Sequence, residues 1–400
     1  MGWLLSTGRR TVTSMLRAGR LCQHDHWSPY YRLFSHAVWN EFEMWRRWVH
    51  WVVSEFCPEG PLLSGGDDTL LKHRGQDIYG LDVFRDAVLS SRSRMVLSFG
   101  HHWVVMFLLV QFPLWPHRWM AVPINARLHL KGSRRTSVDL MKEMMEQLAK
   151  WLPQREIVYV VDGGYSTLAG SLPKGCHLTG RLRSDAATYE LPPPVPPKRR
   201  GRPAQKGKKM RKPCEIAADK RTTWKKIRVG LYGEHRGIEV HSYVAIWDNV
   251  LKQPIRVILS RDPKTKEVAC FLTTDVDRSI EQTIEHYGAR YSVERMFEDA
   301  KQHLGVEDPQ VQSQRSVERM APVAFLMYGA VVCWYATQGH HLWEYHVDPW
   351  YKNKLRASFQ DMLAAARALS LQETISDRST PQADIEKSPL SLRKAVAQGA

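Results

Sequence analysis

Four polar side chains of different chemistry recur at helical spacing in EHYGARYSVERMFEDAKQHLG, residues 285–305. They are Tyr287, Arg290, Glu294 and Lys301. On one continuous helix, which turns by about 100° per residue, their offsets bring all four within about 60° of arc. The carboxylate could ligate a metal ion, the two cations could hold phosphates, and the ring could stack on a base. The alternative is a solvated helix face with an ion pair between Arg290 and Glu294.

Acidic residues also follow two segments with strand character. In PLLSGGDDTLL, Asp67 and Asp68 come directly after Gly65 and Gly66, and such an Asp-Asp pair is commonly found in a turn. In REIVYVVDGGYS, the apolar run IVYVV leads straight into Asp162. That pattern is typical of a buried parallel strand with an acid at its carboxyl end, although Asp162 before Gly-Gly could also be only a turn former.

The elements that must position these acids alternate between strand and helix. Residues 1–60 have helical spacing and are rich in Arg, Trp and His. Strands are expected in the segments HHWVVMFLLVQF, WMAVPINARLHL and CHLTGRLRSD, and a helix in TSVDLMKEMMEQLAKWL, with Thr136 or Ser137 as its N-cap. Residues 224–274 are β-rich again. One long helix is expected from Ser279 to about Leu304, and an apolar helix near residues 316–338. This order predicts an α/β sheet.

The charge of the chain favours a polyanionic partner. The formal net charge is +16 and the pI is about 9.6, which makes nucleic acid the first candidate and an anionic membrane surface the second. The segment LPPPVPPKRRGRPAQKGKKMRK, residues 191–212, is rich in Pro and then dense in basic residues, among them Arg199, Arg200 and Arg202. Its G-R-P core resembles an AT-hook, which lies in the minor groove of DNA. A flexible basic linker is the alternative, and both uses favour phosphate binding.

Other features restrict the class of protein. Hydrophobic residues make up 43% of the chain, enough for a sizeable core. The six cysteines form no C-x-x-C pair, which argues against a structural zinc site and suits a reducing cytoplasm. The N-terminus lacks the apolar core of a signal peptide. The run Ala321 to Gln338 is long enough to be a borderline membrane span, but it contains Pro322 and Gly329 and is interpreted as a buried helix.

The 285–305 segment resembles a large group of bacterial insertion-sequence transposases with the signature Y-(2)-R-(3)-E-(6)-K. The chain carries that spacing without a gap as Tyr287, Arg290, Glu294 and Lys301. GDDT, residues 66–69, resembles the group's first-strand motif, whose acid just before Thr corresponds to Asp68, with Asp67 as the alternative. VVDGGYS resembles the second motif and corresponds to Asp162. The opening GRRTVT, residues 8–13, resembles the insertion-sequence-701-like subgroup.

The resemblance covers roughly residues 60–340 and implies an α/β ribonuclease-H-like catalytic domain over 61–340, interrupted by the basic loop and a β-rich insertion at about 190–265. It leaves a helical region over 1–60 with possible DNA contact, and a C-terminal helical region and polar tail over 341–400. The implied metal ligands and catalytic residues are Asp68, Asp162 and Glu294, which would hold two Mg²⁺ ions for which Mn²⁺ substitutes. The implied DNA contacts are Tyr287, Arg290, Lys301, Arg199, Arg200 and Arg202.

The implied activity is cleavage at transposon ends followed by strand transfer into target DNA. The expected partners are double-stranded DNA and a second copy of the chain in a synaptic complex, with no membrane, in the bacterial cytoplasm. Three alternatives stay open at this point. They are an inactive or domesticated transposase that only binds DNA, another ribonuclease-H-like nuclease or a ribonuclease, and a basic membrane-associated protein.

Overall fold

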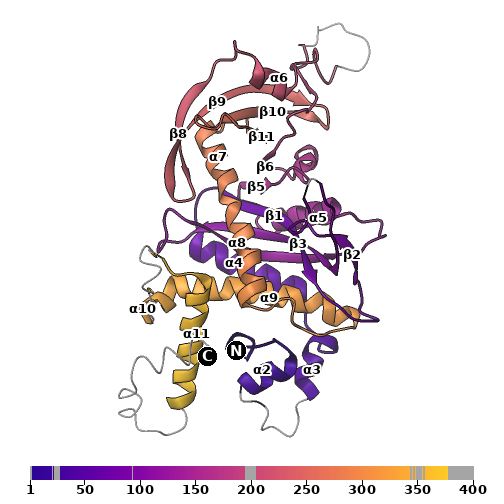
Figure 1. Ribbon diagram of the computed structural model, residues 1–400, viewed down its shortest axis with the longest axis vertical. Coiled ribbons are helices and arrows are strands. Elements are labelled where there is room, and N and C mark those ends of the chain that lie inside the picture. Colours follow the sequence, from indigo (N-terminus) through magenta and orange to yellow (C-terminus); the bar gives the residue numbers. More distant parts are fainter. Residues whose placement is uncertain are drawn as a thin grey trace.

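One large, mostly antiparallel sheet with helices packed around it organises the chain in the computed structural model (Figure 1). The structure describes residues 2–19, 21, 28–91, 93–193, 204–342, 345, 347, 354 and 356–376. The strands are β1 (Leu62–Lys72), β2 (Asp82–Arg85), β3 (Leu97–Gln111), β4 (Trp119–His129), β5 (Ile157–Val161), β6 (Cys176–Arg181), β7 (Thr188–Tyr189), β8 (Lys225–Leu231), β9 (Glu234–Trp247), β10 (Val250–Arg261) and β11 (Val268–Thr273). The α/β prediction is therefore confirmed at the level of a mixed α/β fold.

Five strands form the part of the sheet that carries the predicted acids, in the order β4-β3-β1-β5-β6. Within the first three strands, β3 runs antiparallel to both β4 and β1, whereas β5 and β6 run parallel to β1. The parallel prediction for IVYVV is confirmed, because β5 is buried along its whole length between two parallel neighbours. The remaining strands continue the same sheet, since β11 pairs with β6 and is followed by β10, β9 and then β8.

Helices before and between the strands are α1 (Gly2–Leu5), α2 (Val12–Ala18), α3 (Ser28–Ser35), α4 (Glu41–Phe56), α5 (Ser137–Trp151), the 3-10 helix η1 (Ser166–Ser171) and α6 (Pro213–Ala218). Thr136 is the N-cap of α5, as predicted. Its hydroxyl accepts a hydrogen bond from the Asp139 amide, and the Asp139 carboxylate accepts one from the Thr136 amide. Thr11 caps α2 in the same way, by accepting from Ser14.

Helices after the sheet are α7 (Ile280–Ala289), α8 (Tyr291–His303), α9 (Gln314–Trp334), the π-helical turn η2 (Tyr335–Gly339), α10 (His340–Leu342) and α11 (Phe359–Ser376). The single helix predicted from Ser279 to Leu304 is wrong. The chain forms two helices that meet at Arg290 and follow one another from β8–β11 towards α9 (Figure 1). Each half packs on a different partner. Ile284 of α7 lies in a small apolar cluster with β8–β11, and Val293 of α8 lies in the main core.

The two faces of β1 have different neighbours. Phe107 of β3 lies opposite Gly65 and packs its ring edge-on against Phe297 of α8, with 5.5 Å between centroids. Gly66 points to the other face, where a Cβ atom would lie 2.4 Å from Met141 of α5. Glycine at position 66 is thus explained by the close approach of α5.

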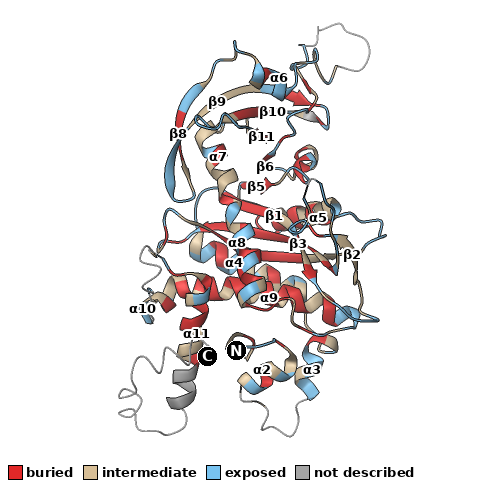
Figure 2. Cartoon of the chain, viewed as in Figure 1, coloured by how far each residue is buried: buried red, intermediate tan, exposed pale blue. Residues whose placement is uncertain are grey.

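The most apolar helix, α9, belongs to the core. Together with the turns after it, over residues 314–342, it is long and apolar enough to cross a membrane, but 61% of its most apolar window is buried inside the protein (Figure 2). It packs extensively against β4, and Phe325 is fully buried. One such buried helix is weak evidence for a membrane span, in line with the buried-helix interpretation.

Candidate active site

Asp67 and Asp68 lie inside the long strand β1, so the interpretation of this segment as a turn is wrong. Successive residues of a strand point to opposite faces, and the two acids are therefore separated. Asp67 shares the α8 face with Gly65, and Asp68 shares the α5 face with Gly66. The parallel register pairs Gly66 with Val161, so the next step along both strands brings Asp67 beside Asp162.

Asp67 lies in a cluster of charges on the α8 face. Its side chain is 16% exposed, and its Oδ2 is 3.4 Å from Nη2 of Arg290. The pKa of Asp67 is raised to about 7, mainly by burial; Arg290 lowers it, and the charges of Asp68 and Asp162 raise it. Carboxylates this close and this poorly solvated favour the addition of a cation.

Arg290 joins two of the acids from the junction between α7 and α8. Its Nη1 donates to Oε1 of Glu294 at 2.8 Å while Nη2 contacts Asp67. Burial lowers the pKa of Arg290, but Asp67, Glu294 and Asp162 outweigh that effect and the net shift is upward. The predicted ion pair between Arg290 and Glu294 is confirmed, and it coexists with the contact to Asp67.

Asp162 ends β5 and serves partly as a turn former. Its Oδ1 accepts hydrogen bonds from the amides of Gly164, at 2.8 Å, and Tyr165, at 3.3 Å. Its Oδ2 makes no hydrogen bond within the described part of the chain. Asp162 can therefore orient one oxygen through the turn and present the other to a ligand.

Asp68 points away from this cluster into a second polar group. Its Oδ2 is 2.6 Å from Nε2 of His102, and its Oδ1 accepts from the Tyr165 hydroxyl at 2.9 Å. Burial alone would raise the pKa of Asp68, but the contacts with His102 and Tyr165 lower it overall. His129 extends the group, with its Nδ1 3.2 Å from Nδ1 of His102. Sequence reasoning missed this group, because its members are separated in the chain.

The remaining predicted site residues do not all lie at the Asp67 cluster. Tyr287 lies at the edge of the cluster with its ring 4.8 Å from that of Phe271. Lys301 lies about 10 Å farther along α8 than Glu294 and donates to the Leu70 carbonyl at 2.9 Å. The face shared by all four signature residues is therefore interrupted by the break at Arg290. Arg199, Arg200 and Arg202 lie outside the described residues.

Arg181 is a neighbour of the site that sequence reasoning missed. It ends β6, the strand next to β5, and its Cβ lies 3.8 Å from where a Cβ of Gly163 would be. Its guanidinium carbon is 5.4 Å from the Phe271 ring centre. A basic residue at the carboxyl end of the strand that follows the Asp162 strand was the available signal.

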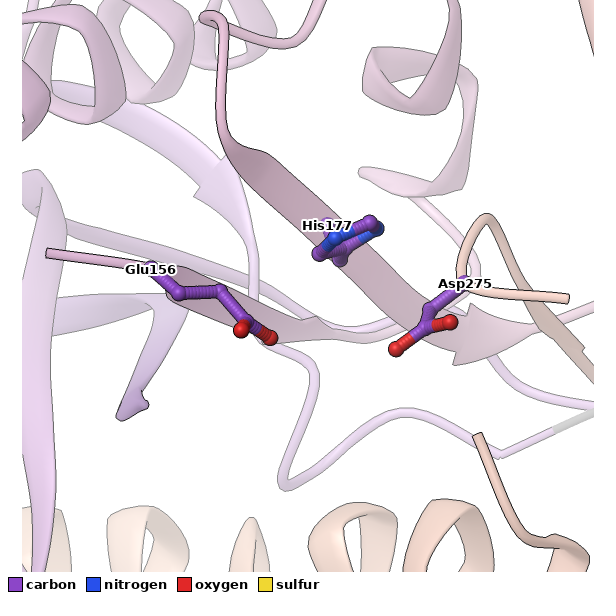
Figure 3. A group of neighbouring side chains, drawn as sticks. All are labelled: Glu156, His177 and Asp275. Carbon is purple, nitrogen blue, oxygen red and sulfur yellow. The ribbon is translucent and has the colours of Figure 1, made fainter. Parts of the chain in front are cut away.

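A second set of potential metal ligands lies at the opposite end of β5. Glu156, His177 and Asp275 precede, lie on and follow three adjacent strands, with one ligand atom of each within 4.8 Å of the others (Figure 3). Arg278 already contacts both carboxylates, at 2.7 Å from Glu156 and 2.9 Å from Asp275. The set is about 20 Å from Asp162 along β5 and separate from the Asp67 cluster.

Comparisons with known proteins identify the family. Residues 1–241 match the family described as DDE superfamily endonuclease, which is more than half of the 400-residue chain. The chain belongs to this family of DNA nucleases that use divalent metal ions. The match includes Asp67, Asp68 and Asp162 and ends before Glu294. No curated protein matches the chain.

Among solved structures, the chain has a distant likeness to the NurA nuclease from Sulfolobus solfataricus, at 9% identity. The likeness covers 66% of this chain and 85% of that chain with a TM-score of 0.26, which is too low to carry an argument about fold or function.

Proposed function

We propose that the protein is a DNA transposase of the insertion-sequence type, with Asp67, Asp162 and Glu294 as the metal-binding carboxylates. The observation that carries the proposal is the convergence of Asp67, Asp162 and Glu294 around Arg290 on one face of the sheet. The uninterrupted Y-(2)-R-(3)-E-(6)-K spacing and the family of DDE endonucleases support the same class. The opening GRRTVT supports the insertion-sequence-701-like subgroup.

The proposed catalytic core is ribonuclease-H-like and consists of β4-β3-β1-β5-β6 with α5 and α8 on its two faces. Three antiparallel strands followed by two parallel ones put the two aspartates on neighbouring strands, and α8 brings the glutamate across them. In this organisation residues 1–60 precede the catalytic domain, the β-rich insertion begins near residue 190, and the helical tail follows residue 340.

Asp67 replaces Asp68 as the first proposed ligand for two reasons. Asp67 shares its face with Arg290 and Asp162, whereas Asp68 is held by His102 and Tyr165 on the other face. A carboxylate that already accepts two short hydrogen bonds has less capacity left for a metal ion. The role proposed for Asp68 is therefore to fix β1 against Tyr165 and thereby to position Asp67.

The three carboxylates fit two Mg²⁺ or Mn²⁺ ions, because hard cations prefer oxygen ligands and the cluster has more negative charge than Arg290 neutralises. Ions bound there would activate water and stabilise the departing 3′ oxygen of a phosphodiester. The guanidinium of Arg290 would then exchange a carboxylate for a phosphate oxygen, which it can bind through two parallel hydrogen bonds. Arg181 and Tyr287 border the same site and would hold the strand near the cut.

Two reactions follow at one site. In the first, water oxygen forms a bond to phosphorus, the bond to the 3′ oxygen breaks, and that oxygen takes up a proton. In the second, the new 3′-hydroxyl attacks a phosphodiester of target DNA in the same way and displaces another 3′ oxygen. Two ends must be processed together, so we also propose that two copies of the chain act in a synaptic complex in the bacterial cytoplasm.

The test uses the DNA that borders the gene, where inverted repeats would mark the element ends. Purified protein with Mg²⁺ should cleave a labelled end and join it to a target plasmid. Glu294→Ala and Asp162→Ala should abolish both steps and leave end binding intact. Cleavage without joining would point to a nuclease that is not a transposase. Binding that neither cleaves nor depends on Glu294 would point to a DNA-binding protein.

A further inference from the structure

A groove of about 880 Å³ lies on the α8 face of the sheet, beyond the carboxyl end of α8. Its walls are the end of β1 with the turn after it, the start of β3, residues 307–312 and Arg9 of the opening GRRTVT segment. It lies about 17 Å from Asp67, because five strand residues separate Asp67 from Lys72.

Both acidic groups in the groove accept hydrogen bonds, and one of them is paired with a cation. Oδ2 of Asp308 accepts from the Arg10 amide at 3.0 Å and is 3.7 Å from the Arg10 guanidinium. Oε1 of Glu307 accepts from the Lys72 amide at 2.8 Å, and Glu307 also lies within the electrostatic range of Lys301. Asp308 is therefore partly neutralised by Arg10, whereas Glu307 is held by a backbone amide.

Two arginines of the groove, Arg9 and Arg74, remain available to an anionic ligand. Both are exposed, both border the groove, and neither has a carboxylate partner within the described part of the chain. Arg9 is held in place by its neighbour, because Arg10 is buried and donates to the His303 carbonyl at 2.5 Å. The GRRTVT segment thus buries one arginine and presents the next to the groove.

The same groove contains exposed apolar surface. Phe99 is 59% exposed and Leu97 is 56% exposed, although both lie in β3. Phe99 takes part in no ring stacking within the described residues, so its face is available. An exposed aromatic ring that shares a groove with two arginines is the combination by which proteins bind single-stranded nucleic acid, with the ring stacking on a base and the cations on the backbone.

We propose that this groove binds a single-stranded segment of DNA, with an unpaired base stacked on Phe99 and its phosphates on Arg9 and Arg74. The proposal rests on the family's DNA substrate, and its distance from the acids implies a strand that continues beyond the cut site. Glu307 and Asp308 shape the groove, and Arg10 offsets the charge of Asp308. Duplex DNA, whose bases are already stacked, would gain nothing from Phe99.

The test uses a fluorescent single-stranded oligonucleotide of about ten nucleotides, within the usual range of about 4–16 per binding site. No metal is added. Phe99→Ala should weaken binding about tenfold, and Phe99→Tyr should restore it. Arg74→Ala should weaken binding and reduce the slope of log K against log salt by about 0.7. Arg47→Ala, at an exposed arginine of α4 outside the groove, should leave the affinity unchanged.

A second measurement locates the base. An oligonucleotide carrying 5-iododeoxyuridine should crosslink under ultraviolet light to the peptide that contains Phe99. Crosslinks that all map elsewhere, or an unchanged affinity in Phe99→Ala, would overturn the proposal, as would equal binding of duplex DNA. Neither measurement needs metal or cleavage. The groove proposal can therefore hold if the transposase proposal fails, and the transposase proposal can hold if the groove proposal fails.

Discussion

Two charge clusters at the two ends of β5 have the same arrangement of charged groups but different surroundings. In each, one arginine contacts two carboxylates from different elements: Arg290 with Asp67 and Glu294, and Arg278 with Glu156 and Asp275. At the Arg278 cluster both carboxylates lie within 3.0 Å of the guanidinium, which is 9% exposed. At the Arg290 cluster the distance to Asp67 is longer, and a third acid, Asp162, lies nearby.

This difference distinguishes a structural ion pair from a candidate active site. Two acids with one well-placed arginine leave a formal charge of −1, and such a group mainly joins elements. Three acids with one arginine leave a larger formal charge of −2 when all are ionised. Burial and then the neighbouring charges raise the pKa of Asp67. A buried acid with a perturbed pKa beside further acids is a candidate for function.

The largest expected effect separates the clusters by activity. Asp162→Ala should reduce the rate of metal-dependent DNA cleavage by about 10³-fold or more, because it removes a proposed metal ligand. Asp275→Ala should leave the rate within about threefold, provided that the protein is folded at the assay temperature. Gel assays on one DNA substrate would compare them, and a greater loss in Asp275→Ala would reverse the assignment.

The second prediction concerns stability. Arg278→Met leaves two acids without their cation and should lower the free energy of unfolding by about 3 kcal/mol, with or without Mg²⁺. Arg290→Met should also destabilise the protein in EDTA, but millimolar Mg²⁺ should restore most of the loss, because the ions replace the missing charge. Urea unfolding in the two buffers measures both. Equal rescue of the two variants, or of neither, would contradict the distinction between the clusters.

The third prediction follows from the pKa of Asp67, which is about 7 in the folded protein and near 3.9 in the unfolded chain. The stabilisation linked to its proton is complete below pH 4 and is lost as the pH rises through 7. Asp67→Asn should therefore stabilise the protein in EDTA at pH 8, by an amount on the order of 2 kcal/mol, and much less at pH 4. Thermal melts at the two pH values test it. A gain that is independent of pH would show that Asp67 is ionised in the fold.

The smallest effect is expected at Asp68. Asp68→Asn keeps the shape of the side chain but weakens its contacts with His102 and Tyr165, so stability should fall by about 1 kcal/mol. The cleavage rate should fall by no more than about tenfold, since Asp68 is proposed to position Asp67 and not to bind metal. A loss as large as that of Asp162→Ala would restore Asp68 as the first ligand.

The sequence predicted the individual helices and strands better than it predicted the contacts between them. The strand IVYVV and the cap at Thr136 followed from local patterns, and both are confirmed. The break at Arg290 could not be predicted, because apolar residues continue at helical spacing through it. The packing differs on its two sides: Gly288 approaches Leu231 of β8 so closely that a Cβ would lie 2.4 Å from that side chain, whereas Val293 lies in the main core.

The choice between Asp67 and Asp68 depends on the same kind of information. Both are strand residues of one chemical type, and only the positions of α5 and α8 decide which face has which neighbours. The Gly-Gly pair before them indicated a turn in the sequence, but in the structure it lies within β1, and Gly66 makes room for Met141. Local chemistry thus identified the acids, and the packing of distant helices determined their surroundings.

The position of Arg290 at the joint between two helices has a mechanical consequence. On one side of it, α7 is attached through Ile284 to β8–β11; on the other, α8 is anchored in the core through Val293. The distances from the Arg290 guanidinium to Asp67 and Glu294 therefore depend on how α7 and α8 are packed on their separate partners.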